Sequence, residues 1–155
     1  MAIRIVRAEE RHIPILAKTL RESDRLELYA SMGQEPFTAL QDSFEASAAS
    51  WCIVVSGEPI LIWGVASYGS LMGRVGMPWM LGSVAMDMHQ LYIARKAPYY
   101  IGLMHRIYPE LMNYVHAKNG RAVRFLEWCG FILSPTPLNI GGEIFYEARR
   151  SICVG

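Results

Sequence analysis

The sequence predicts one α/β domain in which a single mixed sheet is covered by helices. Three observations predict this class. Stretches with the period-two alternation of strands recur between stretches of helical spacing, from residues 3–5 to residues 144–146. A turn-forming tetrapeptide joins two β-prone runs into a hairpin. The 155 residues, 52% of them hydrophobic, suffice for one domain with its own core.

The chain begins with a predicted strand and helix. Ile3 and Ile5 flank Arg4, which is the alternation of a strand with one buried face. Residues 8–20 then change to helical spacing, and their apolar positions share one face: Ile13, Leu16, Ala17 and Leu20.

Two further helices are expected before the hairpin. Ser23 has the side chain of an N-cap and is predicted to start the second helix, which ends where Gly33, Glu35 and Pro36 interrupt it. A third helix is predicted over residues 37–49, with Thr38 as its cap.

The hairpin is predicted from residues 51–55 and 60–67, which the turn Ser56-Gly57-Glu58-Pro59 joins. Three glycines then indicate a loop, namely Gly69, Gly73 and Gly76. Residues 77–81 are predicted to form a further short strand, which ends at Gly82-Ser83.

The second half predicts a long helix, a strand, a short helix and two closing strands. Residues 84–107 are helical in character, and Pro98 is expected to kink or split them because it lacks a backbone N–H. A strand over residues 111–115 precedes a helix over residues 120–128, which Gly130 ends. The closing strands are residues 131–133 and 144–146, separated by a loop with two prolines and two glycines: Pro135, Pro137, Gly141 and Gly142.

Composition and charge argue against several classes of function. The formal net charge is +1, and 15 basic and 14 acidic residues are spread along the chain, unlike a nucleic-acid-binding surface. No apolar run reaches the roughly 18 residues of a membrane span, and the N-terminus lacks a signal-peptide core, so we expect a cytoplasmic protein. Cys52, Cys129 and Cys153 fit no metal or disulfide pattern and are expected to be reduced thiols, and no metal site is expected.

Residues 111–133 carry the most informative motif. A strand ends in Val115, Asn119 follows four residues later, Ala122 lies three further on, and the helix ends in Gly130-Phe131. This arrangement resembles the closing motif of the GNAT N-acetyltransferases. The resemblance implies a GNAT-like acyl-CoA N-acyltransferase fold with a mostly antiparallel sheet, a single domain over residues 1–155, and acetyl-CoA as the cofactor.

A narrower resemblance is to a branch of this fold in tailed phages, grouped with internal virion or virion-associated proteins of short-tailed phages. The motifs that carry it are Asn113-Tyr114-Val115, Asn119, Arg124-Phe125-Leu126 and Pro78-Trp79. The resemblance implies phage structural proteins as partners, and a location in the bacterial host cell or in the virion.

A coenzyme A site needs free backbone N–H groups for the pyrophosphate, at a helix N-terminus with nearby glycines. The resemblance places cofactor-binding residues at Met80, Leu81, Gly82, Ser83 and Asn119. Residues 81–87 meet the need poorly, because they hold one glycine, no basic residue, and an acidic Asp87 that would repel a pyrophosphate. Ser83 and Asn119 are each also predicted as helix N-caps.

A second register for the pyrophosphate loop stays open. Residues 91–93 could be the strand and residues 94–102 the loop, in which Arg95 and Lys96 supply positive charge and Gly102 permits close approach. The alternative for Arg95 and Lys96 is a solvated helix face.

The proton donor of the reaction is also missing from its usual place. The family's common donor is a tyrosine seven residues after the motif Asn and four before the Gly, and both counts reach Leu126, which cannot donate a proton. Tyr114, His116 or Tyr146 could substitute, and for each of them a packing or surface role is the favoured interpretation. No catalytic residue is therefore assigned.

Two hypotheses for function follow. The first is a phage-type GNAT-fold protein, acetyltransferase-like but catalytically degenerate, that acts by contact in virion association or assembly. The second is an active acetyl-CoA-dependent N-acetyltransferase whose acceptor is a small amine or a protein. The missing glycine loop and tyrosine favour the first. A host-defence antagonist that uses the fold as a binding module is a third hypothesis.

Overall fold

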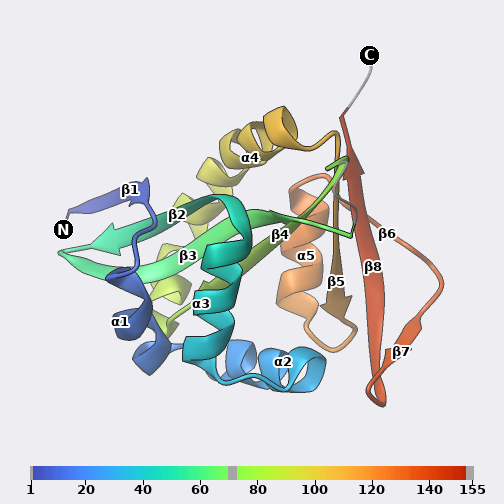
Figure 1. Cartoon of the computed structure of the whole chain (residues 1–155), viewed down its shortest axis with the longest axis horizontal. Helices are drawn as coiled ribbons and strands as arrows, with labels where there is room; N and C mark the ends of the chain where they lie inside the picture. Colours follow the sequence, from blue (N-terminus) through green and yellow to red (C-terminus); the bar gives the residue numbers. More distant parts are fainter. Residues whose placement is uncertain (1, 70–72, 153–155) are drawn as a thin grey trace. The chain divides into compact units, whose positions relative to one another are not determined.

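The computed structural model describes residues 2–69 and 73–152, and its elements follow the order that the sequence predicts (Figure 1). The chain divides into two compact units, one formed by residues 1–66 and 79–90 and the other by residues 67–78 and 91–155. A single domain over residues 1–155 stays a prediction.

Within the described residues, the first unit contains three strands, the end of a fourth, three α-helices and a 3-10 helix. They are β1 (Ile3–Arg7), α1 (His12–Thr19), α2 (Glu22–Met32), α3 (Pro36–Ala46), β2 (Ser47–Val55), β3 (Glu58–Ser67), the end of β4 (Val75–Gly82) and η1 (Val84–His89).

The hairpin of β2 and β3 is confirmed. The two strands are antiparallel with Trp51 opposite Trp63, and β1 adds antiparallel to the other edge of β2. Ser56 and Gly57 have φ values of 49° and 85°, so the hairpin has a two-residue turn with both residues left-handed. This turn matches the twist of the strands it joins.

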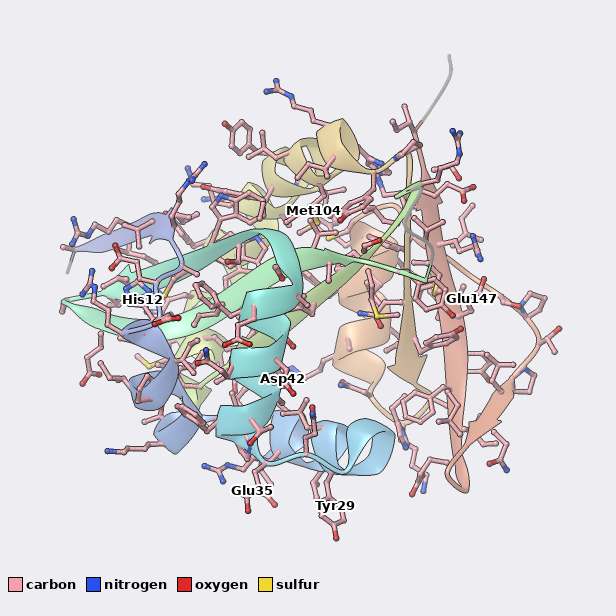
Figure 2. The ribbon with its side chains drawn as sticks, viewed as in Figure 1. His12, Tyr29, Glu35, Asp42, Met104 and Glu147 are labelled. Atoms are coloured by element: carbon pink, nitrogen blue, oxygen red, sulfur yellow. The ribbon has the colours of Figure 1, made fainter. Side chains whose placement is uncertain are left out.

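Helices α1 and α3 lie over the same face of β2 and β3 (Figure 1). The apolar face predicted for the first helix is buried there, together with inward-facing residues of α3 and of the strands. The core cluster comprises Ile13, Leu16, Leu20, Leu28, Ala39, Leu40, Cys52, Val54, Ile62 and Leu81. Tyr29 of α2, in contrast, is 76% exposed and projects away from its helix (Figure 2).

Two predicted helix caps are wrong. Helix α2 begins at Glu22, so Ser23 lies inside its first turn, and the capping position is Arg21 in extended conformation. Helix α3 begins at Pro36, because proline fixes the φ of a first helical residue, and Thr38 is already inside it. Neither Arg21 nor Glu35, the two residues at the capping positions, makes a side-chain cap hydrogen bond.

The second unit contains the start of β4 and the C-terminal half of the chain. Its further elements are α4 (Gln90–Ile107), β5 (Glu110–His116), α5 (Gly120–Trp128), β6 (Ile132–Leu133), β7 (Leu138–Ile140) and β8 (Glu143–Ser151). Strand β5 is parallel to β4 and antiparallel to β8, which pairs with both β6 and β7 on its other edge.

The strand order is β1-β2-β3-β4-β5-β8-β6, with β7 also paired to β8. Strand β4 belongs to both units. All pairings that the structure describes are antiparallel except β4 with β5. This is the predicted mixed, mostly antiparallel sheet with flanking helices. Among the described residues, none of the helices combines the length and the hydropathy of a membrane span.

Two local predictions in this half need correction. Gly76 was expected in a loop but is a buried residue of β4, because the strand starts at Val75. Strand β7 lies in the expected loop, where three residues pair with β8 across the turn at Gly141 and Gly142. Those glycines have φ values of 60° and 85°, which residues with a Cβ rarely adopt.

Helix α4 continues through Pro98 and is not split there. Proline has no N–H, so the carbonyl oxygen of Ala94, four residues earlier, lacks its normal helical donor. The indole Nε1–H of Trp128, from the end of α5, donates to that oxygen at 3.2 Å. A side chain from another helix thus supplies the hydrogen bond that the proline removes.

Cys52 and Cys129 are buried and free. Burial raises the pKa of the Cys52 thiol to about 12 and that of Cys129 to about 11. Both are therefore neutral, unreactive thiols at physiological pH. Cys153 lies outside the described residues.

Candidate functional site

The end of β4 is where the sequence predicts the pyrophosphate contact, and its last residue is already bonded within the protein. The N–H of Gly82 donates to Oδ2 of Asp24 at 2.9 Å, and the carbonyl oxygen of Gly82 accepts from the N–H of Arg21 at 2.9 Å. Leu20 also forms a β-bridge with Ser83. Both main-chain hydrogen-bonding groups of Gly82 are therefore used by residues 21–24.

The next amides are used internally as well. The N–H of Ser83 donates to the carbonyl of Ile60 at 2.9 Å, and that of Met86 donates to the carbonyl of Ser83 at 3.1 Å. The Ser83 hydroxyl accepts from the N–H of Ala85 at 3.3 Å, which confirms Ser83 as the predicted N-cap. The amides of residues 82, 83, 85 and 86 are thus all bonded within the protein.

The charges around Gly82 form one ion network. Arg21 contacts Asp24 at 2.9 Å and Asp87 at 3.2 Å. Asp24 is 4% exposed, so water solvates its carboxylate poorly. Its hydrogen bonds to Arg21 and to the N–H of Gly82 compensate for the lost solvation. Two carboxylates lie beside the Arg21 guanidinium, and each of them would repel a diphosphate.

Gly82 itself is explained by packing. A Cβ placed there would lie 2.2 Å from Sδ of Met86 and 3.2 Å from the carbonyl oxygen of Ile60. The Met86 side chain is buried against this glycine. The single glycine of residues 81–87 therefore makes room for the protein's own side chain.

Strands β4 and β5 pair over only two positions, Val75 with Glu110 and Gly76 with Leu111. Two residues further along each strand, the Asn113 side chain donates through Nδ2 to the carbonyl of Pro78. An amide side chain thus bridges the two strands where their main-chain pairing has stopped. Oδ1 of Asn113 also accepts from the N–H of Tyr114 at 2.7 Å, so the side chain is held at both ends.

Asn119 caps α5, as predicted. Its Oδ1 accepts from the N–H of Ala122 at 3.1 Å, and Gly130, which follows the C-cap Cys129 of this helix, has a φ of 88°. Asn119 belongs to the second unit, whereas Met80, Leu81, Gly82 and Ser83 belong to the first. A cofactor-binding role for these five residues stays a prediction.

Tyr114 has a partner for its hydroxyl. The hydroxyl oxygens of Tyr114 and Tyr68 lie 3.2 Å apart in one hydrogen bond. That bond, and then burial, raise the pKa of Tyr114 above its usual value. The hydroxyl stays protonated at neutral pH, and a raised pKa makes it a weaker proton donor.

Both ring nitrogens of His116 are engaged. Nδ1 accepts from the N–H of Lys118 at 3.1 Å, which requires Nδ1 to be unprotonated. Nε2 then carries the proton and faces Oε2 of Glu143 at 2.9 Å. The ring also packs edge-on against Phe145. With this tautomer His116 joins the end of β5 to β8 and offers no free lone pair for a general base.

Tyr146 is the remaining candidate donor, and Leu126 stands at the position of the family's usual donor. Leu126 lies in α5, where the family's tyrosine would be expected. Tyr146 is half-buried on β8, opposite Val115 of β5. Among the three substitutes, Tyr146 is the one whose side chain is not tied to a described hydrogen bond.

The second register for the pyrophosphate loop is wrong. Residues 91–102 belong to α4, so no strand or loop exists there. Arg95 and Lys96 are exposed on the helix, and the Lys96 ammonium lies 5.6 Å from the ring centroid of Tyr92. These charges form the solvated helix face that was the alternative interpretation.

Three residues that contact β4 were not predicted from the sequence as part of a site, namely Arg21, Asp24 and Asn113. Asp24 lies in a run of charged residues, which is the usual pattern of a solvated surface, and its partner Gly82 is 58 residues away. Asn113 was noted only as part of a motif. Its position two residues after the last β4–β5 pair could have indicated its role once the register was known.

The described residues contain no group of three or more His, Cys, Asp or Glu side chains that could hold a metal ion.

The fold is shared with solved structures of known proteins. No family model and no curated protein sequence matches this chain. Among solved structures, yncA of Salmonella typhimurium with its cofactor acetyl-CoA superposes with a TM-score of 0.75 at 10% identity, over 100% of this chain and 96% of that one. The chain has the GNAT acetyltransferase fold.

Two other GNAT-fold structures agree. AAC(6')-Ib in complex with ribostamycin and coenzyme A gives a TM-score of 0.70 at 15% identity, covering 98% of this chain and 94% of that one. A GNAT-family acetyltransferase from Streptococcus pneumoniae gives 0.65 at 14% identity, covering 97% and 100%. The TM-scores establish the shared fold, and at identities this low they establish no more than the fold.

Proposed function

We propose that this chain is a GNAT-fold protein that does not transfer acetyl groups and acts by contact, as a phage-type virion-associated or assembly protein. The observation that carries the proposal is the state of the main chain after Leu81. The amides of Gly82, Ser83, Ala85 and Met86 all donate within the protein, and one of them donates to a carboxylate. A diphosphate would have to displace these bonds and approach two acidic side chains.

The place where the β4–β5 pairing stops supports the same proposal. A pantetheine arm would need main-chain partners where the strands part. The Asn113 side chain lies across that point and donates to Pro78. Asn113 and Pro78 both belong to the motifs that resemble the phage branch, so the resemblance rests on residues that join two strands.

Active acetyl transfer is the second candidate, and a specific observation favours it. The β4–β5 ladder stops after two residue pairs, and structures with this fold are known with acetyl-CoA bound. On this proposal Met80 would supply main-chain partners for the pantetheine, Asn119 would contact it, and Tyr146 would be the proton donor. The acceptor would be an amine, as aminoglycosides are for AAC(6')-Ib.

Titration calorimetry with acetyl-CoA separates the two candidates. The contact proposal predicts no heat of binding up to about 1 mM ligand, which corresponds to less than about 4 kcal/mol of binding free energy. Micromolar binding, with acetyl transfer to any amine that Tyr146→Phe slows, would establish the enzyme instead.

The contact function needs its own test. The chain is co-expressed with candidate phage structural proteins, and particles are purified from infected cells and analysed by mass spectrometry. The proposal predicts the chain at a fixed copy number in particles or in a complex with a structural protein. Its absence from both, in cells that express it, would contradict the proposal.

A further inference from the structure

Trp128 is held in place by a hydrogen bond and is nevertheless mostly exposed. Its indole N–H donates to the carbonyl oxygen of Ala94 at 3.2 Å, the oxygen that Pro98 leaves without a helical donor. Trp128 is 66% exposed. An aromatic ring that is already fixed loses little conformational entropy when it binds another molecule, so Trp128 has the properties of an interface anchor.

A row of exposed side chains on α4 borders this tryptophan. Leu91 and Tyr99 are 63% and 64% exposed, and Arg95 lies between them, so the three follow one another at intervals of four residues. Because Ala94 directly precedes Arg95 and lies one turn after Leu91, Trp128 lies beside this row. The buried residues of α4 are on the opposite side of the helix: Ile93, Ile101 and Met104.

The arginines beside Trp128 have no acidic partners. Arg95 of α4 and Arg124 of α5 are exposed, and within the described part of the chain neither forms an ion pair with a carboxylate. Elsewhere, Arg21 and Arg149 each contact two carboxylates. Helix α4 contains no Asp or Glu, and Arg124 lies one turn before Trp128 on α5. The positive charge of this face is therefore left for an external partner to balance.

We propose that these five residues, Leu91, Arg95, Tyr99, Arg124 and Trp128, form the surface through which the chain contacts its partner. We call them the α4–α5 surface. The partner is a protein segment in which acidic side chains alternate with apolar ones. Trp128, Tyr99 and Leu91 bury its apolar groups, and the two guanidiniums pair with its carboxylates. This inference rests on the proposed function, to which it adds the surface and the chemical class of the partner.

The composition of the α4–α5 surface favours a protein over nucleic acid or lipid. Tryptophan, tyrosine and arginine are the residues that dominate the binding energy of protein interfaces. A nucleic-acid surface needs a denser array of cations, because each phosphate contact requires one, and the formal net charge of the chain is only +1. A membrane-binding face separates its apolar side chains from its cations, whereas Arg95 lies between Leu91 and Tyr99.

The test selects binders to the intact chain from a displayed library of random peptides and measures their affinities by titration calorimetry. We expect the selected peptides to combine Asp or Glu with Leu or aromatic residues, and to shift the indole N–H resonance of Trp128. Reversing both charges, with Arg95→Glu and Arg124→Glu together, should weaken binding at least about tenfold. Arg4→Glu with Arg7→Glu makes the same change at exposed residues of β1 and should change the affinity by less than about twofold.

The aromatic anchors have a matched control of their own. Trp128→Ala and Tyr99→Ala should each weaken peptide binding about tenfold or more, whereas Tyr29→Ala, which removes a tyrosine that is 76% exposed on α2, should have no effect. If Trp128→Ala does not fold, Tyr99→Ala decides the question, because the Tyr99 ring is exposed and packs edge-on against its neighbour Tyr100.

Several results would overturn the inference. They are a selection without binders, selected peptides without acidic residues, and equal affinities of the two charge-reversed proteins. Tighter binding of a single-stranded oligonucleotide or of phosphatidylserine vesicles through the same residues would also overturn it, because the class of partner would be wrong.

The inference and the proposed function fail separately. If the chain with Arg95→Glu and Arg124→Glu still enters particles or the complex with a structural protein at the normal copy number, the inference is wrong and the proposed function stands. Turnover of acetyl-CoA by the intact chain overturns the proposed function, whatever the peptides show.

Discussion

The indole N–H of Trp128 lies 3.2 Å from the carbonyl oxygen of Ala94, the oxygen that Pro98 leaves without its helical donor. We therefore expect Trp128→Phe, which removes the donor and keeps most of the ring, to lower the free energy of unfolding by about 0.5–1.5 kcal/mol. Chemical denaturation of the two proteins measures the difference.

The control for this prediction is Pro98→Ala, which restores an N–H at position 98. In that background Trp128→Phe should cost clearly less, because Ala94 then has a donor within its own helix. An equal cost in both backgrounds would show that Trp128 acts through packing alone.

Gly64 and Gly102 form a matched pair of glycines with opposite expected effects. A Cβ at Gly64 of β3 would lie 2.7 Å from the carbonyl oxygen of Ala49 and 2.9 Å from Cβ of Ser50. The backbone of β2 would have to move to make room for this Cβ. Gly64→Ala should therefore lower the free energy of unfolding by about 1–3 kcal/mol.

Gly102 lies within α4, and nothing is within 4 Å of the position of its Cβ. Gly102→Ala should therefore stabilise the protein by about 0.5–1 kcal/mol, since alanine loses less entropy in a helix. Thermal melts of both variants should show a lower melting temperature for Gly64→Ala and a higher one for Gly102→Ala. A higher melting temperature for Gly64→Ala would contradict the packing described for β3.

The protein should lose stability as the pH falls below neutrality. His12 lies at the start of α1 (Figure 2), is 2% exposed, and its Nδ1 accepts from the N–H of Glu9 at 3.0 Å. Burial, and then the charge of Arg11, lower the pKa of His12 below its usual value. Burial also lowers the pKa of His105.

The sign follows from proton binding. Below the unfolded pKa of about 6.5 the unfolded chain binds more protons at these histidines than the folded chain does. The free energy of unfolding therefore falls as the pH drops from about 6.5 toward the lower folded values. His12→Asn keeps an acceptor near Glu9 without a titrating group, so its melting temperature should depend less on pH between 7 and 5. An identical slope in both proteins would show that His12 is not held neutral.

Most of the element order was predictable because local signals and tertiary structure agree. The apolar faces of α1 and the two β-strands of the hairpin have the periods that burial requires, and Ser83 and Asn119 cap helices as their side chains suggest. The prediction of Ser23 as a cap was wrong because a contact between residues far apart in the sequence sets the start of α2. The bridge of Leu20 with Ser83 holds the preceding segment extended up to Arg21, and the helix starts directly after it.

The candidate site was less predictable, because its decisive contacts are far apart in the sequence. A poor pyrophosphate loop could be inferred from one glycine and an acid at position 87. That Asp24 bonds the amide of Gly82 could not be inferred, since an aspartate between two arginines looks like a surface residue. The bridge from Asn113 to Pro78 depends likewise on the β4–β5 register.

The most direct test of the proposed function is a ¹⁵N-resolved NMR titration of the intact chain with acetyl-CoA, following the amide resonances of Gly82 and Ser83. We expect these resonances to stay unshifted at millimolar ligand, because the Asp24 carboxylate and the Ile60 carbonyl accept from the two amides. Saturable shifts of the two resonances at micromolar ligand would contradict the proposed function.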